Sequence, residues 1–377
     1  MKKNLFLAAL AGVALVGCAK NEVAQVTDDS QKEISFAAPV VAPVTKADYV
    51  TNTSISTNPS GFTFSVWGWY CEGEGTFASA TAKFYMGLAT DSGVEVTYDN
   101  TINDGTNGSG AWKPATAYYW PKNGKLSFSA YSPTAAKSDG TFRADAATGI
   151  NITNYTVKGL DEQYDLLFSD RAYDKTTSTG GSNDTYDGVD IEFNHALAAI
   201  EIKARLEADY GTDIIKVTKI TLTNVNSHGT FKQNYVNGYY STGTPAAWIS
   251  QTNPVSYELF NGSENVIYNS GTPQAITGCK NAIILPQEIT YSTPGLSTNT
   301  QLIVEYQIKH GSSYLNQKVS QDLHSLNGMK DSTPVTVTSW EIGKRYTYNL
   351  VFGLEEVYFA PDVNIWEDVV MDGITIK

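Results

Sequence analysis

Short runs in which apolar and polar residues alternate recur along most of this chain. Alternation of period two places one face of a β-strand toward a core and the other toward solvent. The runs with this pattern are 62–66, 94–98, 126–130, 189–193, 200–202, 220–222, 302–308, 335–337 and 346–350. Two stretches, 195–202 and 207–214, could instead be helical, but neither is long enough to form a helical layer. Many short strands separated by turns predict an all-β chain built of sandwiches or barrels.

The start of the chain has the features of an export signal. Lys2 and Lys3 precede an apolar run over 5–16 that is too short to be a resident membrane helix. The run ends at Gly17 and Cys18, and the combination resembles the bacterial lipobox. A buried helix with a chance cysteine does not explain why the chain becomes polar directly afterwards. We therefore expect 1–17 to be a lipoprotein signal peptide and Cys18 to carry acyl chains such as palmitate.

The polar stretch 18–33 is typical of a tether, and an extended segment follows it. Pro39 and Pro43 interrupt that segment, which indicates an edge strand or a removable one because proline donates no backbone hydrogen bond. The polar, glycine-containing stretch 207–212 is the best candidate for a boundary between two units. We therefore expect an N-terminal domain over 34–208 and a C-terminal domain over 209–377.

Charge and cysteine content exclude two classes of protein. A net charge of −13 leaves no basic surface for phosphates, so we expect no nucleic-acid partner. Once Cys18 is acylated, Cys71 and Cys279 remain, which is too few for a disulfide framework. A bridge between these two stays open, although two isolated buried thiols are the simpler interpretation.

The residues offer no convincing catalytic or metal site. The histidines His195, His228, His310 and His324 lack the spacing of a zinc helix, and no serine nucleophile motif is present. Neighbouring acidic residues at 161–162 and 355–356 point to opposite faces if extended. Gly188 and its aspartates do not match a calcium loop. We therefore expect no enzyme activity, no cofactor and no metal, while the aromatic residues in 67–70 and 112–120 could stack on sugars or pack in a core.

Several phrases occur in an order that resembles the fimbrillin (Mfa-like) family of Bacteroidetes. They are 34–36 (ISF), 118–121 (YYWP), 126–133 (LSFSAYSP), 165–168 (DLLF), 193–198 (FNHALA) and 343–348 (GKRYTY). The resemblance implies two tandem transthyretin-like β-sandwich domains and a structural subunit of a type V pilus that supports adhesion. It also implies a route of lipidation, transfer to the outer membrane and cell surface, cleavage by a trypsin-like protease, and polymerisation with other pilin subunits by strand exchange.

Particular residues fit this route. Lys46 and Ala47 form a candidate processing site, although the best-known family members are cut after arginine. Cleavage there would remove a first strand containing Ile34, Phe36 and Val40, and a donor strand from another subunit would replace it. The candidate donor residues are Val369, Val370, Met371, Ile374 and Ile376, in a terminal position that suits a stalk subunit. The alternatives are a plain last strand for this segment and, for the protein, a non-polymerising surface lipoprotein that binds glycans through Trp67 or Trp69.

Overall fold

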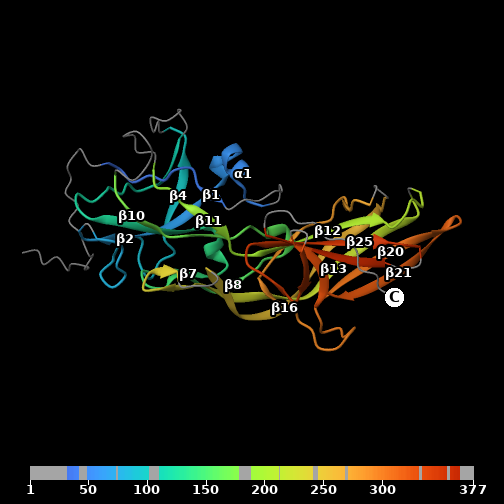
Figure 1. Ribbon diagram of the computed structural model, residues 1–377. Coiled ribbons are helices and arrows are strands. Elements are labelled where there is room, and N and C mark those ends of the chain that lie inside the picture. Colours follow the sequence, from blue (N-terminus) through green and yellow to red (C-terminus); the bar gives the residue numbers. More distant parts are fainter. Residues whose placement is uncertain are drawn as a thin grey trace, which may run out of the picture.

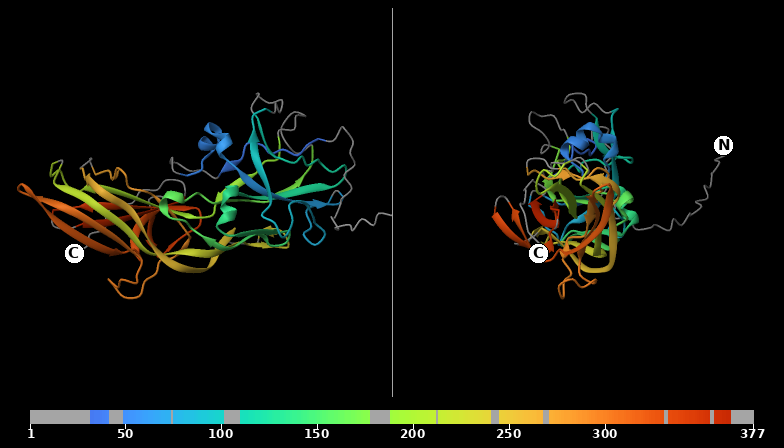
Figure 2. Two further views of the ribbon diagram at one scale, coloured as in Figure 1. Left: turned by 180° about the vertical axis from the view of Figure 1, so that it is seen from behind. Right: turned by 90° about the vertical axis from the view of Figure 1, so that its right-hand side faces the viewer.

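The computed structural model describes residues 32–41, 49–73, 75–101, 110–177, 188–211, 213–240, 245–267, 271–330, 333–354 and 357–365. These residues form a nearly all-β protein, which confirms the fold class that the alternation predicts. Figure 1 shows an elongated molecule whose long strands follow the long axis, and the end-on view in Figure 2 shows a compact cross-section. None of the helices in the described ranges is long and apolar enough to cross a bilayer.

Nine strands of the described residues form a sheet at the N-terminal end (Figure 1). Its main path runs β1-β11-β9-β6-β2-β4-β5, with β10 paired to β6 and β3 paired to β2. The strands are β1 (Val40–Val41), β2 (Phe64–Cys71), β3 (Lys83–Met86), β4 (Val94–Asp99), β5 (Ala111–Pro114), β6 (Lys125–Ser132), β9 (Leu167–Ser169), β10 (Ala172–Lys175) and β11 (Glu192–His195). Strands β2 and β6 are buried on both faces, so other layers cover both sides of this sheet.

Two further large sheets complete the described structure. One contains β7 (Thr141–Asp145), β8 (Gly149–Thr156), β13 (Ile215–Gln233), β16 (Ala246–Asn265), β20 (Gln301–His310) and β21 (Ser313–Asp322). The other contains β12 (Ala198–Leu206), β17 (Gln274–Ala275), β18 (Ala282–Ile284), β22 (Leu326–Lys330), β23 (Thr333–Val337), β25 (Lys344–Phe352) and β26 (Val357–Ile365). The short pairs are β14 (Tyr235–Val236) with β15 (Tyr239–Tyr240), and β19 (Gln287–Glu288) with β24 (Ser339–Trp340). The helical turns are α1 (Asn52–Thr57), η1 (Pro59–Gly61), η2 (Thr134–Ser138) and η3 (Leu160–Glu162).

Buried side chains form three clusters that connect the sheets. The largest lies between β12 and β25 on one side and β13 and β20 on the other. A second joins β2 of the nine-stranded sheet to β7 and β8, and includes Trp67, Trp69 and Phe231. The third covers the opposite face of the nine-stranded sheet. The sheet containing β13 therefore packs on the nine-stranded sheet at one end and on the sheet of β12 and β25 at the other.

Strand pairings join residues on the two sides of position 208, although no strand spans it, since β12 ends at Leu206 and β13 begins at Ile215. Strand β12 lies before residue 208, yet it pairs in parallel with β25 from the far end of the chain. Strand β13 pairs with β20 through its first half and with β8 through its last residues. The stretch 195–202, which could have been helical, is largely β12. Pairing with β25 gives its apolar residues a core on both sides.

Candidate functional site

Residues 32–41, which we term the closing segment, link the two edges of the nine-stranded sheet. Figure 1 shows β1 of this segment near β11. At one edge, β1 pairs in parallel with β11. The backbone N–H of Ala37 donates to the carbonyl of Val189 at 3.0 Å, and that of Val40 donates to Ile191 at 3.1 Å. The closing segment is therefore a neighbour strand of β11.

The other side of the closing segment bonds to the opposite edge of the same sheet. Phe36 and Trp112 of β5 exchange two backbone hydrogen bonds, at 2.8 and 3.3 Å, and the N–H of Ile34 donates to Tyr118 at 2.7 Å. Among the described residues, at least seven backbone hydrogen bonds join the closing segment to the two edges. Its removal would leave both edges with unpaired groups, which is the state in which a sheet accepts a foreign strand.

Alternate side chains of the closing segment enter the third cluster. Phe36 is fully buried, and its ring meets Phe64 edge-on at 5.4 Å and Phe128 at 5.6 Å between centroids. Such edge-to-face geometry is the favoured arrangement of aromatic pairs. The buried residues of the segment are Ile34, Phe36, Pro39 and Val41. The closing segment therefore contributes part of the core as well as hydrogen bonds.

The alternation of the closing segment slips by one residue before β1. Val40, which the sequence places with Ile34 and Phe36, has a side chain that is 50% exposed, whereas Pro39 and Val41 on either side are buried. An extra residue in a strand shifts the side chains that follow it to the opposite face. The inward residues are consequently spaced by two, three and two positions.

Gly188 begins the edge segment 188–193, and the closing segment crosses that segment at this residue. Its φ is +107°, and a Cβ atom there would lie 2.4 Å from the backbone N of Ala37 and 2.5 Å from the carbonyl carbon of Phe36. Glycine is required because both the backbone conformation and the close approach exclude a side chain. In the sequence, Gly188 drew attention only through its poor match to a calcium loop.

Asn52, the first residue of α1, holds the far end of the closing segment. The N–H of Val41 donates to its Oδ1 at 2.8 Å, and its Nδ2 donates to the Val41 carbonyl at 3.2 Å. This side-chain amide therefore satisfies both backbone groups of one residue, as a neighbouring strand would. Thr51 caps α1 by accepting from the N–H of Ser54 at 2.9 Å, which fixes the start of the helix. No pattern in the sequence indicated this role for Asn52.

The chain beyond residues 42–48 is attached to the body separately. Tyr49 is buried in the second cluster, and the N–H of Val50 donates to Oδ2 of Asp165 at 3.2 Å. The same carboxylate lies 2.8 Å from Nδ1 of His195, and both side chains are almost fully buried. His195 is thus a structural residue that positions Asp165. This contact keeps residues 49–50 in place independently of the closing segment.

Most of the predicted site residues lie outside the described ranges. They are Cys18, Lys46, Ala47, Val369, Val370, Met371, Ile374 and Ile376. The structure therefore describes the predicted first strand, with Ile34, Phe36 and Val40, but not its processing site or its candidate replacement.

The tryptophans that could have stacked on sugars are core residues. Trp67 and Trp69 are fully buried in the second cluster, and Trp112 and Trp120 belong to the third. Neither Trp67 nor Trp69 has a face available to a ligand. The glycan interpretation therefore loses its tryptophans, whereas Tyr119 of the same aromatic group is exposed.

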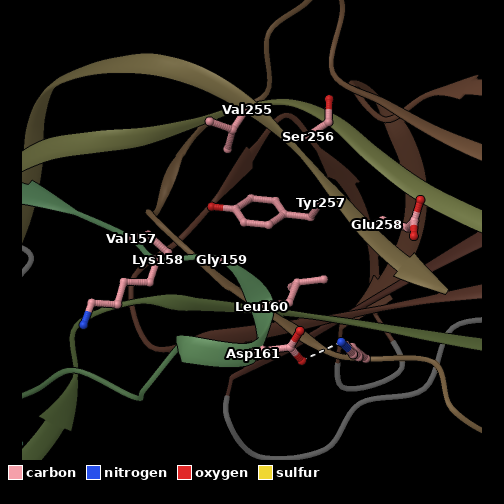
Figure 3. A pocket seen from close by; sticks show the side chains of 10 residues that line it. Val157, Lys158, Gly159, Leu160, Asp161, Val255, Ser256, Tyr257 and Glu258 are labelled. Carbon is pink, nitrogen blue, oxygen red and sulfur yellow. Dashed lines mark hydrogen bonds and ion pairs between the residues drawn. The ribbon is translucent and has the colours of Figure 1, made fainter. Parts of the chain in front are cut away.

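A surface pocket of about 370 Å³ lies where η3 meets β16 (Figure 3). Figure 3 shows the ring of Tyr257 lying across it, above Asp161. The carboxylate of Asp161 pairs with the ammonium group of Lys280 at 2.5 Å. The other carboxylate that lines the pocket, that of Glu258, pairs with Lys219 at 2.8 Å. Burial raises the pKa of Tyr257 to about 12, so its hydroxyl stays protonated. Both carboxylates are thus engaged by ammonium groups, and the arrangement is not an acid and base pair.

Two of the three other histidines have structural partners. His228 Nδ1 lies 3.0 Å from Thr156 Oγ1, and His324 stacks on Tyr291. Within the described ranges, three or more histidine, cysteine or acidic residues are nowhere grouped as metal ligands. Cys71 is buried and Cys279 partly buried, and the two are free thiols.

Comparison with known proteins supports an assignment to a family. The model of the fimbrillin-like family matches residues 64–366. The fold is shared with a fimbrial protein from Bacteroides vulgatus, which is 17% identical over 91% of this chain and 99% of that one, with a TM-score of 0.53. A proposed cell adhesion protein from Bacteroides uniformis (15% identity, 90% and 98% coverage, TM-score 0.48) and a fimbrial assembly protein from Parabacteroides distasonis (10%, 91% and 99%, 0.36) are also similar. No curated protein sequence gave a significant match.

Proposed function

This chain belongs to the fimbrillin-like family, and from that premise we propose that it is a structural subunit of a type V pilus that polymerises by β-strand exchange and supports adhesion. It reaches the outer membrane as a lipoprotein through Cys18, consistent with the cell-surface location that fimbrial relatives imply. A trypsin-like protease then separates Lys46 from Ala47 and releases the lipid together with the closing segment. We assign two tandem transthyretin-like domains, 34–208 and 209–377, to the precursor, and cleavage at Lys46 removes the first residues of the N-terminal one.

The observation that carries this proposal is the double pairing of the closing segment. Its backbone bonds to both edges of one sheet, and its side chains fill a core pocket. Removing it produces two open edges and an apolar groove, which another subunit's strand relieves. Residues Val369, Val370, Met371, Ile374 and Ile376 of a neighbouring copy are the proposed donor.

The distribution of basic residues supports cleavage at Lys46. Between Lys32 and Lys83, Lys46 is the sole basic residue in the sequence. A trypsin-like cut at Lys32 leaves the closing segment in place, and one at Lys83 breaks the sheet at β3. Only Lys46 allows such an enzyme to release the closing segment while residues 49–50 stay bound to Asp165.

The test uses the full chain, purified from membranes in detergent and treated with a trypsin-like protease. The expected result is a ladder of oligomers in denaturing gels without heating, which collapses to monomer on boiling. A Lys46→Gln variant is the matched control and should remain monomeric. Clean removal of the residues up to Lys46 without any oligomer would count heavily against polymerisation.

A further inference from the structure

The groove accepts side chains at an unusual spacing. A regular strand would present every second residue, but the inward positions here are Ile34, Phe36, Pro39 and Val41. The spacing of two, three and two results from the slip that leaves Val40 exposed. A replacement strand has to reproduce this spacing, because a regular alternation would place a polar residue in one of the pockets.

The proposed donor has the same spacing. Its apolar residues Val369, Met371, Ile374 and Ile376 are separated by two, three and two positions, with Asp372 and Gly373 at the slip. Building on the proposed function, we infer that these four residues of a second copy occupy the pockets of Ile34, Phe36, Pro39 and Val41 in that order. Val370 then takes the half-buried position of Ser35, and Thr375 the exposed position of Val40.

The spacing is symmetrical, so the direction of the donor rests on two other observations. A strand with the direction of the closing segment reproduces its parallel pairing with β11 and its bonds to Val189 and Ile191. A reversed strand does not. In the same direction, Met371 enters the pocket of Phe36, where a long flexible side chain fills space between aromatic rings. Reversed, Met371 would take the buried position of Pro39, whose side chain is shorter.

Two residues of the acceptor recognise the donor's backbone. Asn52 bonds to both backbone groups of Val41, and these contacts depend on position but not on side chain. It therefore holds Ile376 of the donor in the same way. Gly188 faces the backbone of Phe36 and Ala37, and so it faces Met371 and Asp372 in the polymer. These contacts fix the register while the pockets select the side chains.

A disulfide between subunits tests register and direction together. Val40 and Glu192 are directly paired in the sheet and both are exposed. Paired strands are about 4.8 Å apart, which suits a disulfide. We would process and polymerise the full chain carrying Glu192→Cys with Thr375→Cys, oxidise it, and run boiled, non-reducing gels. The matched variant carries Glu192→Cys with Val370→Cys, and Glu192→Cys alone controls for the native thiols.

The expected result is a covalent ladder from the Thr375→Cys pair, at least tenfold stronger than from either control. A ladder from the Val370→Cys pair instead overturns the direction. Heat-sensitive polymers of both double variants without covalent linkage overturn the register but leave strand exchange intact. If the unsubstituted chain forms no heat-sensitive polymer, the proposed function fails and the register with it.

The variant Asn52→Ala tests the contact between Asn52 and the donor's backbone separately from folding. The variant should still form heat-sensitive polymers, but these should dissociate at least tenfold faster at a fixed temperature than polymers of the parent. Asn52→Gln, which keeps the amide but moves it, serves as the matched variant and should not restore the parent rate. Equal dissociation rates for Asn52→Ala and the parent would overturn the role of Asn52.

Discussion

Replacing Phe36 by alanine should loosen the closing segment of the precursor and leave the assembled polymer unchanged. The ring is fully buried and meets Phe64 and Phe128 edge-on. Truncation of a buried phenylalanine costs roughly 3–5 kcal/mol, through lost burial and the cavity left behind. At 1.4 kcal/mol for each factor of ten, the lower value raises the open fraction of the closing segment by about a hundredfold.

Hydrogen exchange over residues 32–41 of the precursor measures this opening directly, since local unfolding exposes the amides of Ile34 and Phe36. Val40→Ala on the same segment is the control, because its side chain is half-exposed and should change the opening free energy by at most about 0.5 kcal/mol. An amide exchange rate in Phe36→Ala within threefold of the parent's would refute the claim that the buried ring holds the closing segment in place. A lower dissociation temperature of the Phe36→Ala polymer would show that the segment is retained after assembly.

Three further outcomes follow from other contacts. Asp165→Asn should weaken the hydrogen bonds to Val50 and His195, by about 1.5–3 kcal/mol for a charged acceptor. The Val50 amide should then exchange at least tenfold faster, and an unchanged exchange rate would contradict the role of Asp165 in holding residues 49–50. Gly188→Ala should destabilise both the precursor and the polymer, because the added methyl group meets backbone in each; a polymer as heat-resistant as the parent's would be inconsistent with the shared groove. Burial, with Glu201 nearby, raises the pKa of the Cys279 thiol to about 12, so the thiol is protonated at pH 8. Its rate of alkylation, followed by mass spectrometry, should therefore rise tenfold per pH unit up to pH 10. The rate for an ordinary thiol of pKa about 8.5 has levelled off by that pH.

The strands were predictable because alternation reports burial of one face directly. Runs such as 94–98 and 302–308 became β4 and β20. Helix α1 was not predicted, since 52–57 is polar and its start depends on the Thr51 cap. The great length of β13 and β16 was also missed, because each strand packs against different neighbours along its course and several register shifts interrupt its pattern.

The residues that form and fill the groove were only partly predictable from the sequence. Ile34 and Phe36 follow the alternation, and Pro39 indicated an irregular strand, but the slip that buries Val41 depends on the edge beside it. Asn52 and Gly188 act through backbone contacts with residues distant in sequence, and such contacts leave no periodic signal. The pairing of β12 with β25 likewise joins segments that are distant in sequence, so no local pattern indicates it.

The most direct test of the central claim is the N-terminal residue of this protein in fibres sheared from the cell surface. If the closing segment leaves before assembly, Edman degradation or mass spectrometry of the fibre subunit will give Ala47 as its first residue. An acylated Cys18 at the start of the assembled subunit would mean that the closing segment stays in its groove, and would contradict strand exchange at this site.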